Sequence, residues 1–190
     1  MDPTEVVEAK RAWRAAVRTA RRGRAARPGR EAADQRIAGA GLALVAAVTH
    51  GRGCRVGAYA ARPTEPPTAA LVEGLRRAGH HVLLPVTCPE RTLEWDCDGV
   101  RLPPAALGSA AVVFTPGLAV DVAGRRLGQG GGYYDAALRH VPATVPVLTL
   151  LWDEELVEGP LPVQAHDRRV DGVLTPGGGV RWVRDVTREG

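Results

Sequence analysis

The chain has 190 residues, of which 45% are hydrophobic and only 4% aromatic, and its formal net charge is +4. This length suits one domain with a core of small aliphatic side chains. No apolar stretch approaches the roughly 18 residues that cross a bilayer, and the start has no charged-then-apolar secretion signal, so we expect a soluble, cytoplasmic protein. The three cysteines form no CxxC pair, which argues against a disulfide framework or a zinc knuckle.

Basic side chains are concentrated at the start of the chain. Residues 1–30 carry nine basic and three acidic residues, whereas the rest carries sixteen and eighteen. A local excess of positive charge favours a polyanionic partner, either a nucleic acid or a nucleotide. All basic residues except Lys10 are arginines, so this single lysine deserves more weight than any one arginine.

Apolar periodicity predicts alternating helices and strands. A first, basic helix is expected over about residues 3–25, and because Lys10 and Arg14 are four residues apart they share one of its faces, which Arg18 and Arg21 roughly continue. The later elements are predicted at 30–48 (helix), 55–59 (strand), 68–78 (helix), 81–84, 92–95 and 111–115 (strands), 132–140 (helix), and 145–151, 173–175 and 180–183 (strands). This alternation predicts a single-domain three-layer α/β/α fold over residues 1–190, with a mostly parallel central sheet.

The most informative segment runs from Gly124 to Asp135, between a predicted core strand and a predicted helix. Its glycines let backbone N–H groups approach an anion closely, and the following helix offers its positive N-terminus. It is not a Walker A loop, because it contains no lysine, and it is not a Rossmann fingerprint, because Tyr133 stands where GxGxxG from Gly128 requires glycine. Glycines used only for turning are the alternative, but four in five residues are costly in chain entropy without a ligand.

The stretch from Pro116 to Asp135, PGLAVDVAGRRLGQGGGYYD, resembles the signature of the 5-formyltetrahydrofolate cyclo-ligase family. It matches at nearly every position, with Val120 where the family usually has Phe. Weaker matches extend over most of the chain and comprise Lys10 to Arg14, Tyr59, Glu65 to Thr68, Leu84 to Thr87, Pro162, His166, Asp167 and Asp171.

This resemblance implies an enzyme that converts 5-formyltetrahydrofolate to 5,10-methenyltetrahydrofolate, using ATP and Mg²⁺ and releasing ADP and phosphate. ATP would phosphorylate the formyl oxygen, the folate N10 would attack the activated carbon, and phosphate would leave. The implied partners are a reduced folate and ATP, with no nucleic acid and no membrane, and the implied state is a monomer.

The resemblance also assigns residues to the site. The ATP-binding residues it implies are Lys10, Arg14, Arg126, Leu127, Gly128, Gln129, Gly130, Gly131, Gly132, Tyr133, Tyr134 and Asp135. Arg126 and Tyr134 would take part in catalysis, and Asp135 with Asp167 would hold Mg²⁺.

The folate side of the site is implied at Tyr59, Glu65 and Trp95. From the residues alone, simpler interpretations stay open: Glu65 as a carboxylate at a helix start, Tyr59 and Trp95 as ordinary core, and Lys10 as a solvated surface charge.

Two departures from the family pattern leave other functions open. A Gly-hydrophobic-x-Glu-Pro segment, common in the family, is missing between Trp95 and Val112, and Glu155 stands where Gln is common. The missing segment favours a paralogue, an ATP-dependent ligase or kinase acting on a non-folate substrate. A third hypothesis is nucleic-acid binding through the arginine-rich segment 10–30, although no RNA-binding motif accompanies it.

Overall fold

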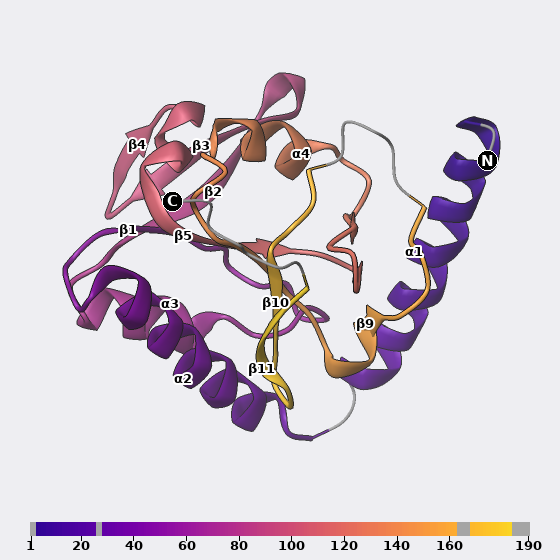
Figure 1. Cartoon of the computed structure of the whole chain (residues 1–190), viewed down its shortest axis with the longest axis horizontal. Coiled ribbons are helices and arrows are strands. Elements are labelled where there is room, and N and C mark those ends of the chain that lie inside the picture. Colours follow the sequence, from indigo (N-terminus) through magenta and orange to yellow (C-terminus); the bar gives the residue numbers. More distant parts are fainter. Residues whose placement is uncertain (1–2, 26–27, 163–167, 184–190) are drawn as a thin grey trace.

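The computed structural model, shown in Figure 1, describes residues 3–25, 28–162 and 168–183. Its centre is an eight-stranded sheet made of β1 Arg55–Gly57, β2 His81–Cys88, β3 Thr92–Cys97, β4 Val100–Leu102, β5 Ala110–Pro116, β8 Val147–Leu150, β10 Gly172–Thr175 and β11 Gly179–Trp182. The strand order is β11-β10-β8-β5-β1-β2-β3-β4. The strands from β10 to β2 are parallel, and the edge strands β11, β3 and β4 are antiparallel.

Two helices, α2 (Arg30–Thr49) and α3 (Ala69–Arg77), cover one face of this sheet (Figure 1). Ile37, Gly41 and Val45 of α2 recur every four residues, so they form one buried stripe. A Cβ atom at Gly41 would lie only 2.7 Å from Leu71 of α3. The absence of a side chain at Gly41 therefore allows the two helices to pack closely.

The opposite face is covered by shorter elements, which are η2 Pro104–Ser109, α4 Tyr133–Ala137 and η3 Leu138–His140. The sheet has a hydrophobic core on each face, and adjacent residues of β5 point to opposite cores. Phe114 packs in the core beneath α2, and Val113 packs with Leu107 and Leu138 in the other. A strand buried on both faces is continuously apolar, which is why this segment was readable in the sequence.

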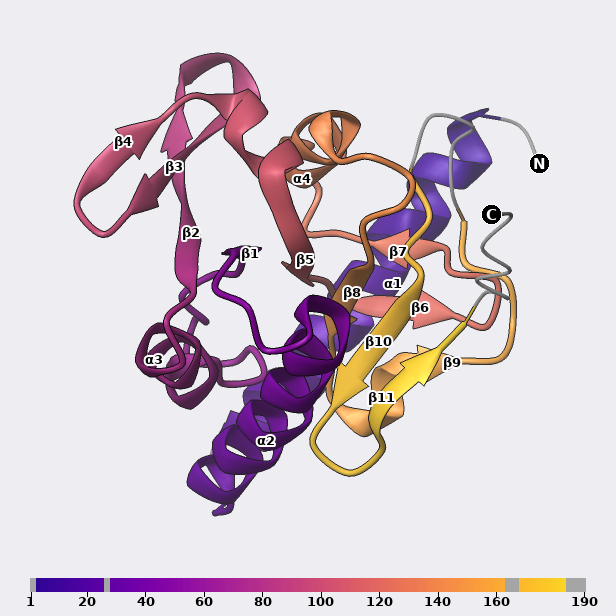
Figure 2. The same cartoon turned by 60° about the vertical axis from the view of Figure 1, so that its left-hand side comes forward.

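A small second sheet, with order β7-β6-β9, stands beside the large one. Its strands are β6 Ala119–Asp121, β7 Arg126–Leu127 and β9 Leu156–Val157. The helix α1 (Pro3–Ala25) lies along it (Figure 2), where Val17 packs against Leu118, Leu127 and Leu161. No helix in the described ranges is long and apolar enough to cross a membrane.

Asp121, at the end of β6, ties this second sheet together. Its fully buried carboxylate accepts hydrogen bonds from the backbone N–H groups of Ala123 (2.9 Å), Arg125 (3.0 Å) and Leu161 (2.9 Å) and an ion pair from the Arg125 guanidinium (2.5 Å). Burial by itself raises the pKa of Asp121, but these hydrogen bonds more than offset it, so its pKa lies below the ordinary value. The ionised carboxylate is therefore part of the fold.

The predicted α/β fold with a mostly parallel sheet and helices on both faces is confirmed, and the first two helices lie where they were expected. Two details differ. The strand predicted to end before Pro85 continues to Cys88, because β1 pairs with β2 only from His81 to Leu83, so Pro85 has an open edge on that side and needs no N–H donor there. The small sheet was missed, since two- and three-residue strands carry almost no periodicity.

Candidate active site

The glycine loop lies where the sequence predicted it, after the carboxyl end of β5 and immediately before α4. Gly130 and Gly132 have positive φ angles of 98° and 74°, a region that side chains other than glycine rarely occupy. A Cβ atom at Gly130 would lie 3.3 Å from the Arg14 guanidinium, and one at Gly128 would lie 3.2 Å from Arg126. Arg14 and Arg126 therefore contact the loop closely at Gly130 and Gly128, respectively.

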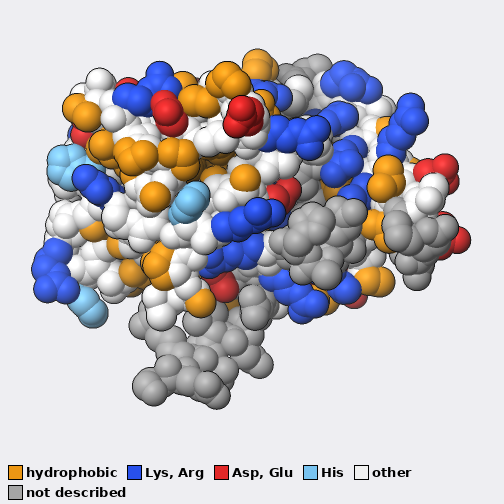
Figure 3. Space-filling model, turned by 90° about the horizontal axis from the view of Figure 1, so that it is seen from above, with side chains coloured by type: hydrophobic (Ala, Val, Ile, Leu, Met, Phe, Trp, Pro, Cys, Tyr) orange, Lys and Arg blue, Asp and Glu red, His pale blue; other side chains and the backbone are white. Residues whose placement is uncertain are grey.

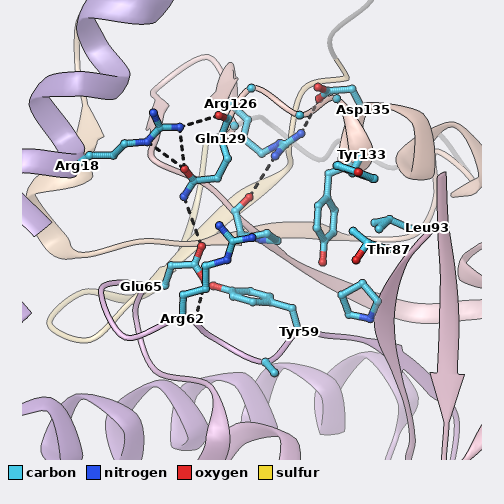
Figure 4. A pocket seen from close by; sticks show the side chains of 18 residues that line it. Arg18, Tyr59, Arg62, Glu65, Thr87, Leu93, Arg126, Gln129, Tyr133 and Asp135 are labelled. Carbon is cyan, nitrogen blue, oxygen red and sulfur yellow. Dashed lines mark hydrogen bonds and ion pairs between the residues drawn. The ribbon is translucent and has the colours of Figure 1, made fainter. Parts of the chain in front are cut away.

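The loop borders a cavity of about 470 Å³ at the carboxyl ends of the central strands (Figure 4). Tyr59 follows β1, Pro85 and Thr87 come from the second half of β2, and Pro116 ends β5. In open α/β sheets, ligands bind at this end of the strands, and the volume is that of a site for a small organic molecule.

A second cavity, of about 420 Å³, lies on the other side of the glycine loop. Gly130, Gly132 and Asp135 line both cavities, and Lys10 and Arg14 of α1 line the second, together with Arg91 and Arg139. Figure 3 views the molecule from above and shows Lys and Arg side chains gathered on the side of the molecule where α1 lies. These four cations outnumber the acidic residues that line the second cavity, Glu90 and Asp135, so the cavity is electropositive, as a site for phosphate groups requires.

A hydrogen-bonded chain crosses the first cavity from α1 to the loop after β1. Arg18 donates to the backbone oxygen of Gln129 (2.8 Å) and to its side-chain oxygen, and the Gln129 amide reaches Glu65 at 3.4 Å (Figure 4). The other oxygen of the buried Glu65 accepts from the backbone N–H of Arg62 at 2.9 Å. Gln129 and Glu65, predicted for the ATP and folate sides respectively, thus meet within one cavity.

Arg126 and Asp135 form an ion pair at 2.6 Å on the wall of the same cavity. The Arg126 side chain is only 3% exposed, also donates to the oxygen of Pro116 (3.1 Å) and lies 5.9 Å from the centre of the Tyr134 ring. Asp135 is 33% exposed. The guanidinium is therefore held in a fixed position with its charge at the edge of the cavity.

The hydroxyl groups of Tyr59 and Tyr134 are buried and have no hydrogen-bond partner among the described residues. Burial raises the pKa of Tyr59 well above its ordinary value, with a further contribution from Glu65, and burial also raises the pKa of Tyr134. Both hydroxyls are therefore protonated at neutral pH. A buried donor without an acceptor costs about 1–3 kcal/mol, so a ligand that offers acceptors here would recover that energy.

Of the predicted site residues that the structure describes, Leu127 and Trp95 line neither cavity. Leu127 is 1% exposed and packs against Leu118 and Leu161 beside the small sheet. Trp95 is 1% exposed, packs in the core under η2, and donates its indole N–H to the oxygen of Pro104 at 3.1 Å. Leu93, two residues earlier on the same strand, lines the cavity instead. Asp167 lies outside the described residues.

Sequence reasoning did not assign Arg18, Arg62, Thr87 or Leu93 to the site, although all four line the cavity. A signal existed for Arg18 only, because it follows Arg14 by four residues and shares its helical face. The others come from loops and strand ends that meet only in the folded sheet.

A buried ion pair fixes α1 to the rest of the site. Arg21 of α1 contacts both carboxylate oxygens of Glu155, each at 2.7 Å, and also donates to the oxygen of Gly117 at 2.6 Å. Glu155 accepts the backbone N–H of Trp152 at 2.9 Å as well. Burial raises the pKa of Glu155, and its hydrogen bonds with Arg21 and Trp152 oppose that rise. Glu155 is the position noted in the sequence as one where Gln is common in the family pattern.

Together, the fold and the site define an open α/β protein with a glycine-rich loop between a core strand and a helix. A model of the 5-formyltetrahydrofolate cyclo-ligase family matches residues 98–176. The 5-formyltetrahydrofolate cyclo-ligase of Mycolicibacterium smegmatis is 36% identical over 153 residues, which cover 70% of this chain and 78% of that protein. The mouse protein of that name is 37% identical over 79 residues, 40% of this chain and 38% of its own length. This chain belongs to the 5-formyltetrahydrofolate cyclo-ligase family, which confirms the resemblance noted in its sequence.

Two solved structures share the fold. The 5,10-methenyltetrahydrofolate synthetase of Mycoplasma pneumoniae superposes with a TM-score of 0.68 at 18% identity and covers 86% of this chain and 96% of its own. That of Aquifex aeolicus gives a TM-score of 0.69 at 22% identity, with 93% of each chain covered. At these identities the two structures support the fold alone.

Proposed function

We propose that this chain converts 5-formyltetrahydrofolate to 5,10-methenyltetrahydrofolate with consumption of ATP and with Mg²⁺ as cofactor. Family membership supports this activity. The observation that carries the proposal is one cavity with the glycine loop and Arg126 on one side and Tyr59 and Glu65 on the other. Such a cavity holds a phosphoryl donor and a polar organic acceptor next to each other, which is what the reaction requires.

The chemistry is a dehydration with a poor leaving group, the formyl oxygen. Transfer of the γ-phosphoryl group of ATP to that oxygen, with release of ADP, turns it into a good leaving group. The N10 lone pair then forms the new carbon–nitrogen bond, N10 gives up its proton to solvent, and phosphate departs with the electrons of the carbon–oxygen bond. Catalysis of such a transfer consists mainly of positioning and charge stabilisation.

The cations that surround the glycine loop fit the phosphate side of this reaction. Lys10 and Arg14 line the electropositive cavity, and Arg126 is fixed at the boundary between loop and α4. Backbone N–H groups from Gly128 to Gly132 supply neutral donors. We assign Arg126 and Tyr134 to the reacting centre, because the arginine faces the tyrosine ring across the wall of the cavity.

Asp135 offers a suitable ligand for Mg²⁺. It is one-third exposed and lines both cavities, and Mg²⁺ is commonly held by one or two carboxylates together with substrate phosphates and water. When bound, the ion would neutralise charge on the phosphates. Arg126 orients the carboxylate for that role. Asp167 remains a predicted second ligand.

Tyr59, Glu65 and Tyr134 fit the folate side. The two hydroxyls are buried donors without a partner in the described chain, and Glu65 is a buried acceptor. A pterin ring presents both N–H groups and carbonyl or nitrogen acceptors along its polar edge, so this set is complementary to it. Leu93 and Pro85 add apolar surface to the same cavity.

The test is a spectrophotometric assay of the purified chain with 5-formyltetrahydrofolate, Mg²⁺ and ATP, in which the near-ultraviolet band of the methenyl product is followed. Growth of the band, with one ADP formed per methenyl group, is expected. Controls without ATP, without Mg²⁺ or without folate should stay flat. Folded protein that binds ATP and yields no methenyl product would refute the proposal.

One observation favours a second candidate, a paralogous ATP-dependent ligase or kinase acting on a non-folate substrate. In place of the family's additional segment, β3 passes directly to β4 through a two-residue turn at Asp98 and Gly99. ATP binding without binding of reduced folates, measured by calorimetry, would support this candidate.

Nucleic-acid binding receives less support, because Arg14, Arg18 and Arg21 contact the glycine loop, Gly117 and Glu155. We expect no RNA binding at moderate salt, a cytoplasmic location and a monomer, which a gel-shift assay, cell fractionation and size-exclusion chromatography with light scattering would test.

A further inference from the structure

A second cluster of reactive side chains lies at the opposite end of the sheet from the active-site cavity. His81 begins β2 and Cys97 ends β3, whereas Thr87, which lines the cavity, is near the far end of β2. Asp98 stands in the turn that joins β3 to β4. None of the three contributes to the cavities that border the glycine loop.

The pairing of β2 with β3 brings these residues together. In the antiparallel ladder Leu84 faces Asp96, so His81 and Cys97 project from the same side of the sheet. Asp98 and Gly99 both have positive φ angles, 54° and 84°, as a tight hairpin turn requires. The turn directs the Asp98 carboxylate back over β2, where its Oδ2 atom lies 3.2 Å from Nδ1 of His81.

The three side chains can each offer one ligand atom, and these atoms all lie within 4.8 Å of one another. Ligands around a tetrahedral zinc ion, with bonds of about 2.0–2.3 Å, lie about 3.5 Å apart. A decrease of about 1 Å in the distances between these ligand atoms would therefore bring them to tetrahedral geometry. His81 and Asp98 are 66% and 48% exposed, so their side chains have room to rotate towards the buried Cys97.

We propose that His81, Cys97 and Asp98 bind a transition-metal dication of the zinc class, with water in the fourth position. A thiolate with an imidazole selects Zn²⁺ over the hard ions Mg²⁺ and Ca²⁺. Arg76 of α3 lies 3.5 Å from Oδ1 of Asp98, which leaves Oδ2 directed at the ion. Such a partner behind a ligand fixes the orientation of the ligand.

Binding changes no oxidation state. The Cys97 S–H bond breaks, its proton passes to water, and the sulfur forms a bond to the metal, so one proton is released per ion. This site is separate from any Mg²⁺ held with ATP, because its thiolate and imidazole do not suit Mg²⁺ and it lies at the other end of the sheet.

The test uses the whole chain, reduced and freed of metal, titrated with Co²⁺ as a spectroscopic substitute for Zn²⁺. We expect one Co²⁺ per chain, a thiolate-to-cobalt charge-transfer band that Zn²⁺ abolishes, and no displacement by millimolar Mg²⁺. Cys97→Ser should remove the band, and His81→Ala should weaken binding about tenfold or more. The matched control is Cys54→Ser. The Cys54 thiol is hydrogen-bonded to Nδ1 of His80 (3.3 Å), the residue before His81, but Cys54 is not part of the cluster.

Absence of a charge-transfer band in the wild-type chain would overturn the proposal, as would a band that persists in Cys97→Ser or disappears in Cys54→Ser. If Cys97→Ser does not fold, as judged by circular dichroism, His81→Ala and Asp98→Asn decide the matter, because both side chains are exposed. Both variants should show full affinity for ATP, which keeps this test independent of the proposed enzyme activity.

Discussion

Replacement of Glu155 by Gln would test how firmly α1 is held against the site. The present carboxylate accepts two bonds from Arg21 and one from the backbone N–H of Trp152. Glutamine has the same shape but only one oxygen. In either orientation, its amide N–H₂ group faces at least one of these donors, so a donor is left without an acceptor.

The expected loss follows from burial of the pair, since Arg21 is 2% and Glu155 5% exposed. Removal of one partner from a buried ion pair costs about 3–5 kcal/mol. Gln keeps one oxygen for hydrogen bonding, so we expect a loss of about 2–3 kcal/mol. For a chain of this length, that corresponds to a fall in Tm of about 4–12 °C.

Thermal unfolding followed by circular dichroism measures the effect, with Glu154→Gln as the matched control. Glu154 is 52% exposed and pairs with Arg24 on the surface, a kind of pair that typically contributes under about 1 kcal/mol. Glu155→Gln should also raise the KM for ATP, since α1 carries Lys10 and Arg14. Equal Tm values for the two variants would refute the reasoning.

Three further predictions concern the site and its support. Lys10→Ala should raise the KM for ATP roughly tenfold or more, as expected for loss of a charge-assisted hydrogen bond to phosphate, while the chain stays folded as judged by circular dichroism. The exposed neighbour Arg11→Ala is the control, and equal kinetics of the two variants would count against the role of Lys10. Asp135→Asn should shift the Mg²⁺ titration of activity to higher concentration, roughly tenfold, and an unaltered titration would contradict its role as a ligand. The pKa of Asp121 is lowered in the folded chain, so its contribution to the free energy of unfolding is complete above the unfolded pKa of about 4 and is lost as pH falls through the folded value. Asp121→Asn should therefore be less stable than the wild-type chain at pH 7 and should lose less stability below about pH 4. Parallel acid-unfolding profiles of the two chains would contradict this account.

The parts of the fold that were predictable are those with long, uniform patterns. Helices α1 and α2 repeat apolar residues over five or more turns, and the central strand β5 is apolar from Ala110 to Phe114 because both of its faces are buried. The glycine loop was predictable for a different reason. The loop requires glycines because Gly130 and Gly132 have positive φ angles and because Arg14 and Arg126 lie close to its backbone. The backbone geometry therefore determines the residue type, which is visible in the sequence.

Features that depend on pairing between distant segments were not predictable. The contact between Gln129 and Glu65 joins the glycine loop to the turn after β1, and neither local pattern reports the other. The surroundings of Trp95 were not predictable for the same reason. Its burial as ordinary core was one of the open interpretations, and only the position of η2 determines that its indole N–H donates to the oxygen of Pro104.

The missing Glu-Pro segment bears on substrate choice, and the structure limits how much. The shortened region lies between Trp95 and Val112, and its turn at Asp98 and Gly99 is at the end of the sheet away from the cavity. None of residues 96–109 lines the cavity, whose proposed folate side is formed by Tyr59, Glu65, Thr87 and Leu93. The short turn that favours the paralogue therefore lies apart from the proposed folate side in this chain, so it is compatible with the cyclo-ligase as well. If reduced folates failed to bind, these four residues would be examined first, with substitutions at Thr87 and Leu93 as the test of altered specificity.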